Sequence, residues 1–176
     1  MIRLEGIPVI DTSRLRLRGP RFDDYEAYAA FMASDRARFV GGPLGRWQAW
    51  RGFCHVTGHW VHRGFSTFVI ADRDSDAAIG MCGPWFPEGW PEPEIGWSIW
   101  SPDHEGKGLA FEAVTAARRF AYDVLGWTTA ISMIDHGNDR SAALALRLGA
   151  VHETDYTDDT LGSCRIFRHP GPGALA

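Results

Sequence analysis

Residues 94–112, EIGWSIWSPDHEGKGLAFE, are the stretch that decides the fold of this chain. They predict a strand, a short glycine-rich loop and the first turn of a helix. Such a loop leaves free backbone N–H groups at a helix N-terminus, where the helix dipole also favours negative charge. Gly106 and Gly108 have no Cβ, so a phosphate can approach their main chain closely. The pattern predicts a binding site for the diphosphate of a nucleotide-like ligand.

The spacing of these glycines excludes two common nucleotide motifs. A P-loop needs Gly, four residues and then Gly-Lys-Ser/Thr, which residues 106–109 do not supply. A dinucleotide fingerprint needs a third glycine where this chain has Phe111. A Gly-x-Gly taken alone is also typical of an ordinary turn before a helix, so a second signal is needed.

That signal comes from residues 138–149, NDRSAALALRLG. Polar residues that cap helix N-termini begin this segment, and Gly149 ends it at a position suited to a helix C-cap. The short apolar segment 129–134 precedes it and is typical of a buried strand. The two segments predict a second strand–loop–helix unit.

Four segments in this order resemble the GNAT superfamily of N-acetyltransferases, and most closely the branch that acetylates the N-termini of ribosomal proteins. They are IDTSRLRLR at 10–18, AIGMCG at 78–83, EIGWSIWSPDHEGKGLAFEA at 94–113 and NDRSAALALRLGA at 138–150. The resemblance implies an α/β fold, with a mixed central sheet that contains a splayed parallel strand pair and is flanked by helices. We expect one such domain over residues 1–170, followed by a flexible tail, 171–176, that is rich in Pro and Gly.

Length and charge agree with a single enzyme domain. The chain has 176 residues, enough for one sizeable core, and a net charge of −4, which argues against a nucleic-acid partner. Arg14, Arg16 and Arg18 alternate with leucines, so we expect them on the solvent face of a strand.

Three widely spaced cysteines fit a reduced, cytoplasmic setting better than a disulfide framework. No apolar run is long enough for a signal peptide or a membrane span, so we expect a soluble protein with no membrane partner, as a monomer or homodimer. His55, His59 and His62 have helical spacing, but no carboxylate or cysteine motif completes a metal site, and none is expected.

The resemblance implies acetyl-CoA as co-substrate, held by several parts of the chain. The loop would bind the diphosphate through main-chain N–H groups, and the splayed strand would pair with the pantetheine arm through its main chain. Asn138 would contact that arm with its side chain, although it is equally typical of a plain helix cap. The expected cofactor-binding residues are Ser98, Ile99, Trp100, Glu105, Gly106, Lys107, Gly108, Leu109, Ala110, Asn138 and Ser141.

One loop residue departs from the family pattern. Glu105 stands where the family usually has Gln or Arg, and an acidic side chain would repel a diphosphate, so we expect it to point away. Lys107 is the better electrostatic partner for the ligand, or a solvated lysine with no role.

The resemblance implies two catalytic candidates. Glu94 begins the splayed strand where many relatives carry a carboxylate base, and burial beside tryptophans would raise its pKa; it is also an ordinary strand-end glutamate. A main-chain N–H within residues 97–99 would polarise the thioester carbonyl. The family's usual tyrosine acid is replaced by Ala145, so Ser141, otherwise a first-turn helix residue, or solvent would protonate the leaving thiolate.

Trp85, Trp90 and Trp97 lie in a span interrupted by Gly and Pro. Aromatic residues on strands usually belong to the core, but Trp85 and Trp90 are predicted on a loop, where a large apolar ring needs a reason. We expect them to bind the acceptor, which favours an aromatic or apolar amine or a peptide N-terminus with a bulky side chain.

The predicted function is acetyl-CoA-dependent acetylation of a primary amine, on a protein N-terminus or a small molecule, by direct transfer in a ternary complex. The alternative is a degenerate member that binds acyl-CoA and regulates without turnover. Ala145, Glu105 and Ala150, which stands where an aromatic residue is usual, favour that alternative, whereas Glu94 and Ser141 favour the enzyme.

Overall fold

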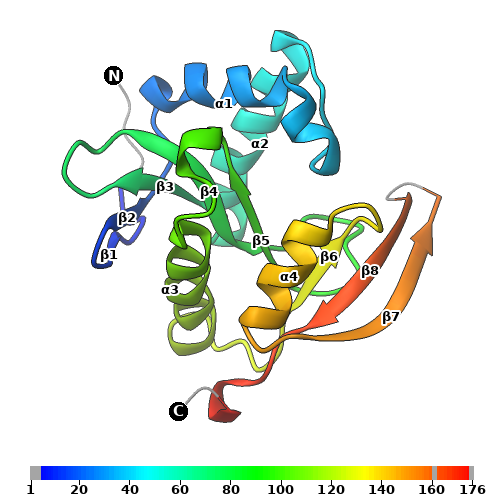
Figure 1. The fold of residues 1–176 in the computed structure, drawn as a ribbon. Helices are drawn as coiled ribbons and strands as arrows, with labels where there is room; N and C mark the ends of the chain where they lie inside the picture. The colour runs from blue at the N-terminus through cyan, green and yellow to red at the C-terminus, as the bar shows by residue number, and fades with distance from the viewer. Residues whose placement is uncertain (1–4, 160–161, 175–176) are drawn as a thin grey trace.

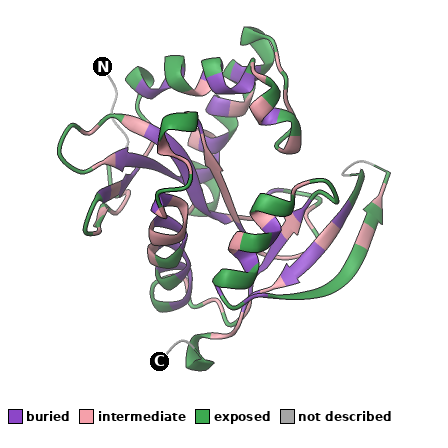
Figure 2. Ribbon diagram, viewed as in Figure 1, coloured by how far each residue is buried: buried purple, intermediate pink, exposed green. Residues whose placement is uncertain are grey.

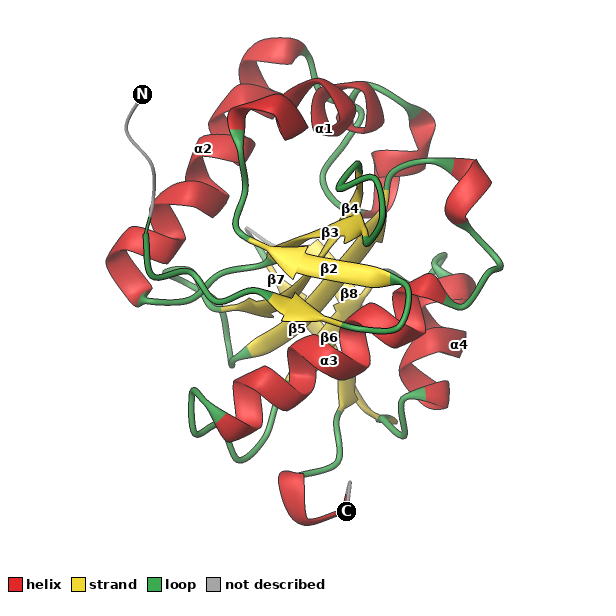
Figure 3. Ribbon diagram, turned by 90° about the vertical axis from the view of Figure 1, so that its left-hand side faces the viewer, coloured by secondary structure: helices red, strands yellow, loops and turns green. Residues whose placement is uncertain are grey.

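A mixed sheet between two helical layers forms the molecule (Figures 1 and 3). The computed structural model describes residues 5–159 and 162–174. In these residues the strands are β1 (Ile10–Asp11), β2 (Leu15–Arg18), β3 (Phe68–Asp72), β4 (Ala78–Trp85), β5 (Glu94–Ile99), β6 (Ile131–Ile134), β7 (Val151–Asp158) and β8 (Gly162–Arg168). The α-helices are α1 (Tyr25–Met32), α2 (Arg46–Arg63), α3 (Leu109–Asp123) and α4 (Asp139–Arg147).

The sheet has the order β1-β2-β3-β4-β5-β6-β8-β7. Every neighbouring pair is antiparallel except β5 and β6, which are parallel. This mixed sheet with one parallel pair and flanking helices confirms the fold that the sequence predicts.

Both faces of the central strands are buried, which explains why residues 68–71 of β3 are all apolar. Phe68 and Ile70 belong to the core that α3 covers, and Val69 belongs to the core under α1 and α2. A third, smaller core lies under α4, where Ala142 and Ala145 pack on Phe167 of β8. Figure 2 shows this burial concentrated in the middle strands and absent from most of β7.

Two secondary-structure expectations are wrong in detail. Trp85 is the last residue of β4 rather than part of a loop. The sequence also predicts no strand at Val151–Asp158, where β7 pairs with β8 at the edge of the sheet. Most of its residues are exposed and polar, so it lacks the apolar alternation by which a half-buried strand is recognised.

The expectation that Arg18 faces solvent is also wrong. Its side chain is 3% exposed, and its two terminal nitrogens donate to the carboxylate of Asp24, both at 2.8 Å. Arg18 Nε donates to Asp76 Oδ1 at 2.9 Å. A charged side chain is buried here because two carboxylates from other segments satisfy it.

The chain end is only partly described. Pro172–Ala174 forms a short 3-10 turn, and the Tyr122 hydroxyl donates to the carbonyl oxygen of Pro170 at 2.9 Å. Residues 175–176 lie outside the described residues, and the flexibility of 171–176 stays a prediction.

Candidate active site

The two parallel strands separate almost as soon as they meet, and this opening centres the site. Glu94 and Ile131 are paired, and Ile131 N–H donates to the carbonyl of Pro93 at 3.0 Å. One residue further on, Ser132 Oγ, not a main-chain group, donates to the carbonyl of Ile95 at 2.6 Å. Beyond this point β5 and β6 diverge (Figure 1), and we call the gap between them the wedge.

Alternation along β5 decides which main-chain groups face the wedge. The carbonyl of Ile95 faces β6, so those of Trp97 and Ile99 face the same way. Trp100 N–H instead donates to the carbonyl oxygen of Ile79 at 2.9 Å, and the Ser98 carbonyl oxygen lies against the α-carbon of Gly80, where a Cβ would clash with it, so both face β4.

The residues expected to contact pantetheine through their main chain point to different sides of β5. Ser98 and Trp100 direct their main-chain groups to β4, and Trp100 is buried in the core under α1 and α2. Ile99 keeps its expected place, and Trp97 joins it as the second residue whose main chain faces the wedge.

The glycine-rich loop adopts a conformation that requires glycine. Gly106 and Gly108 have φ of 71° and 75°, in the left-handed region, and Gly108 is the N-cap of α3. Two hydrogen bonds hold this region from behind. Glu112 Oε1 accepts from the Thr12 hydroxyl at 2.6 Å. Arg14 Nη1 donates to the carbonyl oxygen of Lys107, within the loop, at 2.9 Å.

The loop lines a groove of about 330 Å³ that runs to α4. Of the loop residues in the expected cofactor-binding set, Glu105, Gly106, Gly108, Leu109 and Ala110 line it, whereas Lys107 is exposed and outside it.

Glu105 does not avoid the ligand site but is neutralised within it. Its Oε1 accepts from Arg36 at 2.5 Å, and its Oε2 pairs with Arg140 at 2.5 Å. Burial alone would raise the pKa of Glu105, but these two arginines outweigh it and lower the pKa. The repulsion expected between this residue and an anion is thus compensated by nearby cations.

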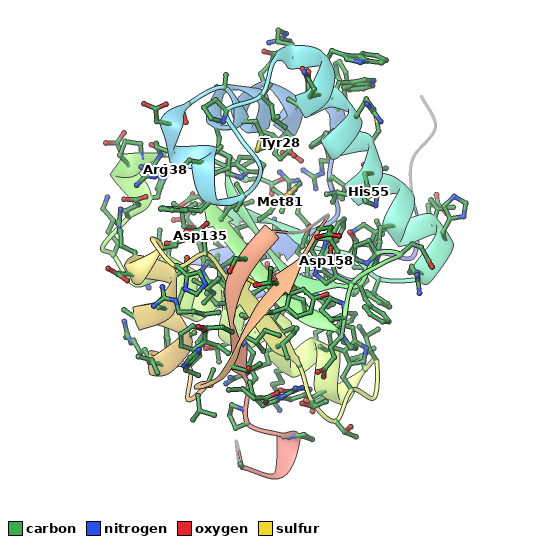
Figure 4. The ribbon with its side chains drawn as sticks, turned by 90° about the vertical axis from the view of Figure 1, so that its right-hand side faces the viewer. Tyr28, Arg38, His55, Met81, Asp135 and Asp158 are labelled. Atoms are coloured by element: carbon green, nitrogen blue, oxygen red, sulfur yellow. The ribbon has the colours of Figure 1, made fainter. Side chains whose placement is uncertain are left out.

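A second cavity, of about 620 Å³, opens between the wedge and the α1–α2 layer, and we call it the acceptor cavity. The three tryptophans expected there, Trp85, Trp90 and Trp97, all line it. Figure 4 looks from this side: Tyr28, Arg38 and Met81 lie toward the helical layer, and Asp135 lies below them, next to the strands.

Glu94 lies in the wall of the acceptor cavity and is 8% exposed. Its Oε2 accepts from Trp90 Nε1 at 2.6 Å, and its Oε1 accepts from Met133 N–H at 3.1 Å. Burial raises the pKa of Glu94, and the two hydrogen bonds oppose this without cancelling it. This agrees with the direction expected of a base buried beside tryptophans.

Asn138 and Ser141 stand at the start of α4, where the groove and the acceptor cavity meet. Asn138 is the N-cap, and its Oδ1 accepts from Ser141 N–H at 3.2 Å. Trp97 Nε1 donates to Ser141 Oγ at 3.3 Å, which leaves the Ser141 hydroxyl proton free for another acceptor. Ala145, where the family has tyrosine, is fully buried on the inner face of α4.

Comparison with known proteins agrees with this geometry. A family model described as "Acetyltransferase (GNAT) domain" matches residues 14–151. The chain belongs to the GNAT family of acetyltransferases.

Solved structures give the same answer. An acetyltransferase from Agrobacterium tumefaciens is 32% identical, with a TM-score of 0.85 over 96% of this chain and 98% of its own. A GNAT-family acetyltransferase from Bacillus anthracis (18% identity, TM-score 0.73, 92% and 96% covered) shares the fold. So does the ribosomal-protein-S5-alanine acetyltransferase from Vibrio fischeri (15% identity, TM-score 0.70, 94% and 97% covered). The comparisons confirm the predicted family and the prediction that the chain is an N-acetyltransferase.

Members of the GNAT family use acetyl-CoA as co-substrate, and the residues of this GNAT enzyme fit that molecule. The main-chain groups of Trp97 and the N–H of Ile99 face the wedge and could pair with the amides of a pantetheine arm, whereas the Ile99 carbonyl accepts from Arg36. The left-handed loop at the N-terminus of α3 presents N–H groups to a diphosphate. When bound, acetyl-CoA supplies an activated acetyl thioester.

Sequence reasoning missed the arginines of the groove. Arg36, Arg38, Arg140 and Arg147 all line it, and they come from the loop after α1 and from α4. The only signal was Arg140, two residues after Asn138; nothing local marks the other three.

Within residues 5–159 and 162–174, no group of three His, Cys, Asp or Glu side chains is placed to hold a metal ion. In the same part of the chain, no helix combines the length and apolarity needed to cross a membrane. His59, from the histidine series, donates through Nδ1–H to the Phe65 carbonyl oxygen at 2.6 Å and stacks on Trp85.

Proposed function

We propose that this GNAT enzyme transfers the acetyl group of acetyl-CoA directly to a primary amine held in the acceptor cavity, within a ternary complex. One observation carries the proposal: the groove and the acceptor cavity share Trp97, Ser98, Asn138 and Ser141 in their walls. A thioester reached from one side and an amine from the other would meet at these residues, and no covalent enzyme intermediate is required.

Glu94 is the proposed base. An ammonium group must lose a proton before the amine can attack. The raised pKa of Glu94 brings that pKa closer to the pH at which the enzyme works, so its carboxylate is a better acceptor for this proton. Trp90 and Met133 fix both carboxylate oxygens, so the side chain is oriented before the amine arrives. The proton passes directly or through one water.

Ser141 and the main chain of β5 complete the proposed site. The Ser141 hydroxyl, oriented by Trp97, has a free proton to donate to the leaving thiolate, and the serine oxygen regains a proton from solvent. The N–H groups of Trp97 and Ile99 face the wedge and could donate to the thioester oxygen as it gains charge.

The acceptor cavity favours an amine with an apolar or aromatic side chain, on a peptide N-terminus or a small molecule. Phe31, Met32, Val56 and Met81 line it together with the tryptophans, so most of its wall is apolar. Acid groups are few there: Glu94 and Asp135. A polycation would find too little opposite charge.

The decisive variant is Glu94→Gln, which keeps the size of the side chain and one of its two acceptor oxygens but removes the base. Loss of the base should lower turnover by roughly 10²–10⁴-fold, and acetyl-CoA binding, measured by calorimetry, should stay within about twofold. Glu88→Gln is the matched control, since Glu88 is fully exposed on the neighbouring loop.

The assay is amine-dependent thiol release with a panel of peptide N-termini and small amines. A turnover of the Glu94→Gln variant within threefold of the parent's would refute the assignment of Glu94 as the base. If the parent binds acetyl-CoA but releases thiol with no acceptor, the alternative of a regulatory acyl-CoA-binding protein replaces the enzyme.

A further inference from the structure

Three side chains from distant segments meet across the groove, and we call them the clasp: Arg36, Glu105 and Arg140. Arg36 lies in the 3-10 helix Asp35–Phe39, Glu105 follows the 3-10 helix Pro102–His104, and Arg140 is in the first turn of α4. Each oxygen of the Glu105 carboxylate bonds a different arginine at 2.5 Å. All three residues line the groove.

The clasp also reaches the wedge. Arg36 Nη2 donates to the carbonyl of Ile99 at 3.0 Å, one of the main-chain groups that β5 directs toward the gap. Arg36 Nε is buried and has no partner in the described structure. Arg36 therefore occupies the Ile99 carbonyl, an acceptor that faces the wedge, while its own Nε–H remains unsatisfied. Such an arrangement is suited to an exchange of hydrogen-bond partners.

We propose that Glu105 is an internal stand-in for the diphosphate of acetyl-CoA. It pairs with Arg36 and Arg140 when the groove holds no anion, and the diphosphate displaces it as their partner. The exchange turns both guanidinium groups toward the ligand and uncovers the Ile99 carbonyl. This inference rests on acetyl-CoA binding in the groove, as the proposed function does.

The charge of Glu105 opposes binding of the anion and favours release of the product. In the clasp one carboxylate cancels one of two positive charges, so an incoming anion must compete with it. The same carboxylate stands ready to reclaim the arginines, which favours release of CoA after transfer. Glutamine or arginine, the residues usual at this position in the family, would compete less or not at all.

The test is Glu105→Gln, with CoA and pantetheine as probes and calorimetry at low salt as the measurement. We expect CoA to bind roughly 5–20-fold more tightly, as a charge change of one unit near a partly buried anion implies. Pantetheine has no phosphate, so its affinity should stay within about twofold. Glu26→Gln is the control, because it removes the same charge from an exposed pair with Arg46.

Two results would overturn the proposal. If CoA affinity is unchanged or weaker, Glu105 does not compete with the ligand. If pantetheine tightens as much as CoA does, Glu105 obstructs the groove by its size and not by its charge.

A second variant tests the arginine side. Arg140→Gln should weaken CoA binding by roughly 3–10-fold and leave pantetheine unaffected; an unchanged CoA affinity would remove Arg140 from the anion site and end the proposal. Both variants are measured by binding without an acceptor amine. Failure of the clasp is therefore distinguishable from failure of Glu94-dependent acetyl transfer.

Discussion

The apex of the wedge is held by a buried polar chain whose protonation is dictated by its partners. Ser132 Oγ donates its one proton to the Ile95 carbonyl, so it must accept from His169 Nε2–H at 2.9 Å. His169 Nδ1 then carries a lone pair and accepts from Arg118 Nη1 at 3.0 Å. The contacts admit neutral histidine in a single tautomer.

Protonation of His169 would place a second proton donor against a guanidinium in a site that is 2% exposed. Burial, followed by the charge of Arg118, lowers the pKa of His169 to about 3. An unfolded histidine titrates near 6.5. Between these two values the unfolded chain binds a proton that the folded protein does not.

The sign follows from that difference. The free energy of unfolding is unaffected by His169 above pH 6.5 and falls as the pH decreases below it, by about 1.4 kcal/mol per pH unit. From pH 7 to pH 5 this one residue costs about 2 kcal/mol. Glu94 acts in the opposite sense, because its raised pKa lets the folded protein take up a proton as the pH falls.

The comparison of the parent protein with His169→Gln separates the two effects. Glutamine can still donate to Ser132, but it does not titrate. Because one buried hydrogen bond is lost, the variant should be less stable than the parent at pH 7 by about 1–3 kcal/mol. The gap between the two proteins should narrow by about 2 kcal/mol at pH 5. Urea unfolding followed by tryptophan fluorescence measures both; a gap that stays constant between pH 7 and 5 would refute the protonation argument.

Two further substitutions test the cavity and the core. Gly96 lines the acceptor cavity, and a Cβ there would meet nothing within 4 Å. Gly96→Val should therefore raise the KM for bulky amines roughly tenfold and leave calorimetric CoA affinity unchanged; an unaltered KM for every active acceptor would contradict this. Asp24→Ala leaves the buried Arg18 with Asp76 as its remaining carboxylate partner, and it should lower the free energy of unfolding by about 3 kcal/mol; a loss below about 1 kcal/mol in urea unfolding would show that Asp76 suffices.

Elements with a strong local signal were predictable from the sequence. The loop that follows the strand at 94–99 carries Gly106 and Gly108 at positions that require positive φ, which no other residue adopts as readily. Helix α4 has a capping Asn138 at its start, and the structure uses it as the N-cap. By contrast, β7 is polar and exposed, and among the described strands it pairs with β8 alone, so no local pattern reveals it.

The site was predictable where a role depends on main-chain conformation or on one side chain, and not where it depends on partners from other segments. Glu94 could be placed because it begins a strand beside tryptophans. The choice between Ser98 and Trp97 for the wedge depends on the register of β5 against β4, which the sequence does not specify. Arg18 was misplaced for the same reason, since its carboxylates come from a helix turn and a distant hairpin.

Glu105 shows how far such reasoning can go. A carboxylate in a site built for an anion is unfavourable unless cations neutralise it, so the residue itself predicts that positive partners exist. It does not predict which ones, because Arg36 and Arg140 reach it only after α1, β5 and α4 have been assembled around the wedge. A residue that contradicts its assigned role is therefore informative. It marks the position where the fold must supply compensation, and in this enzyme the compensating arginines are also the groups for which the co-substrate would compete with Glu105.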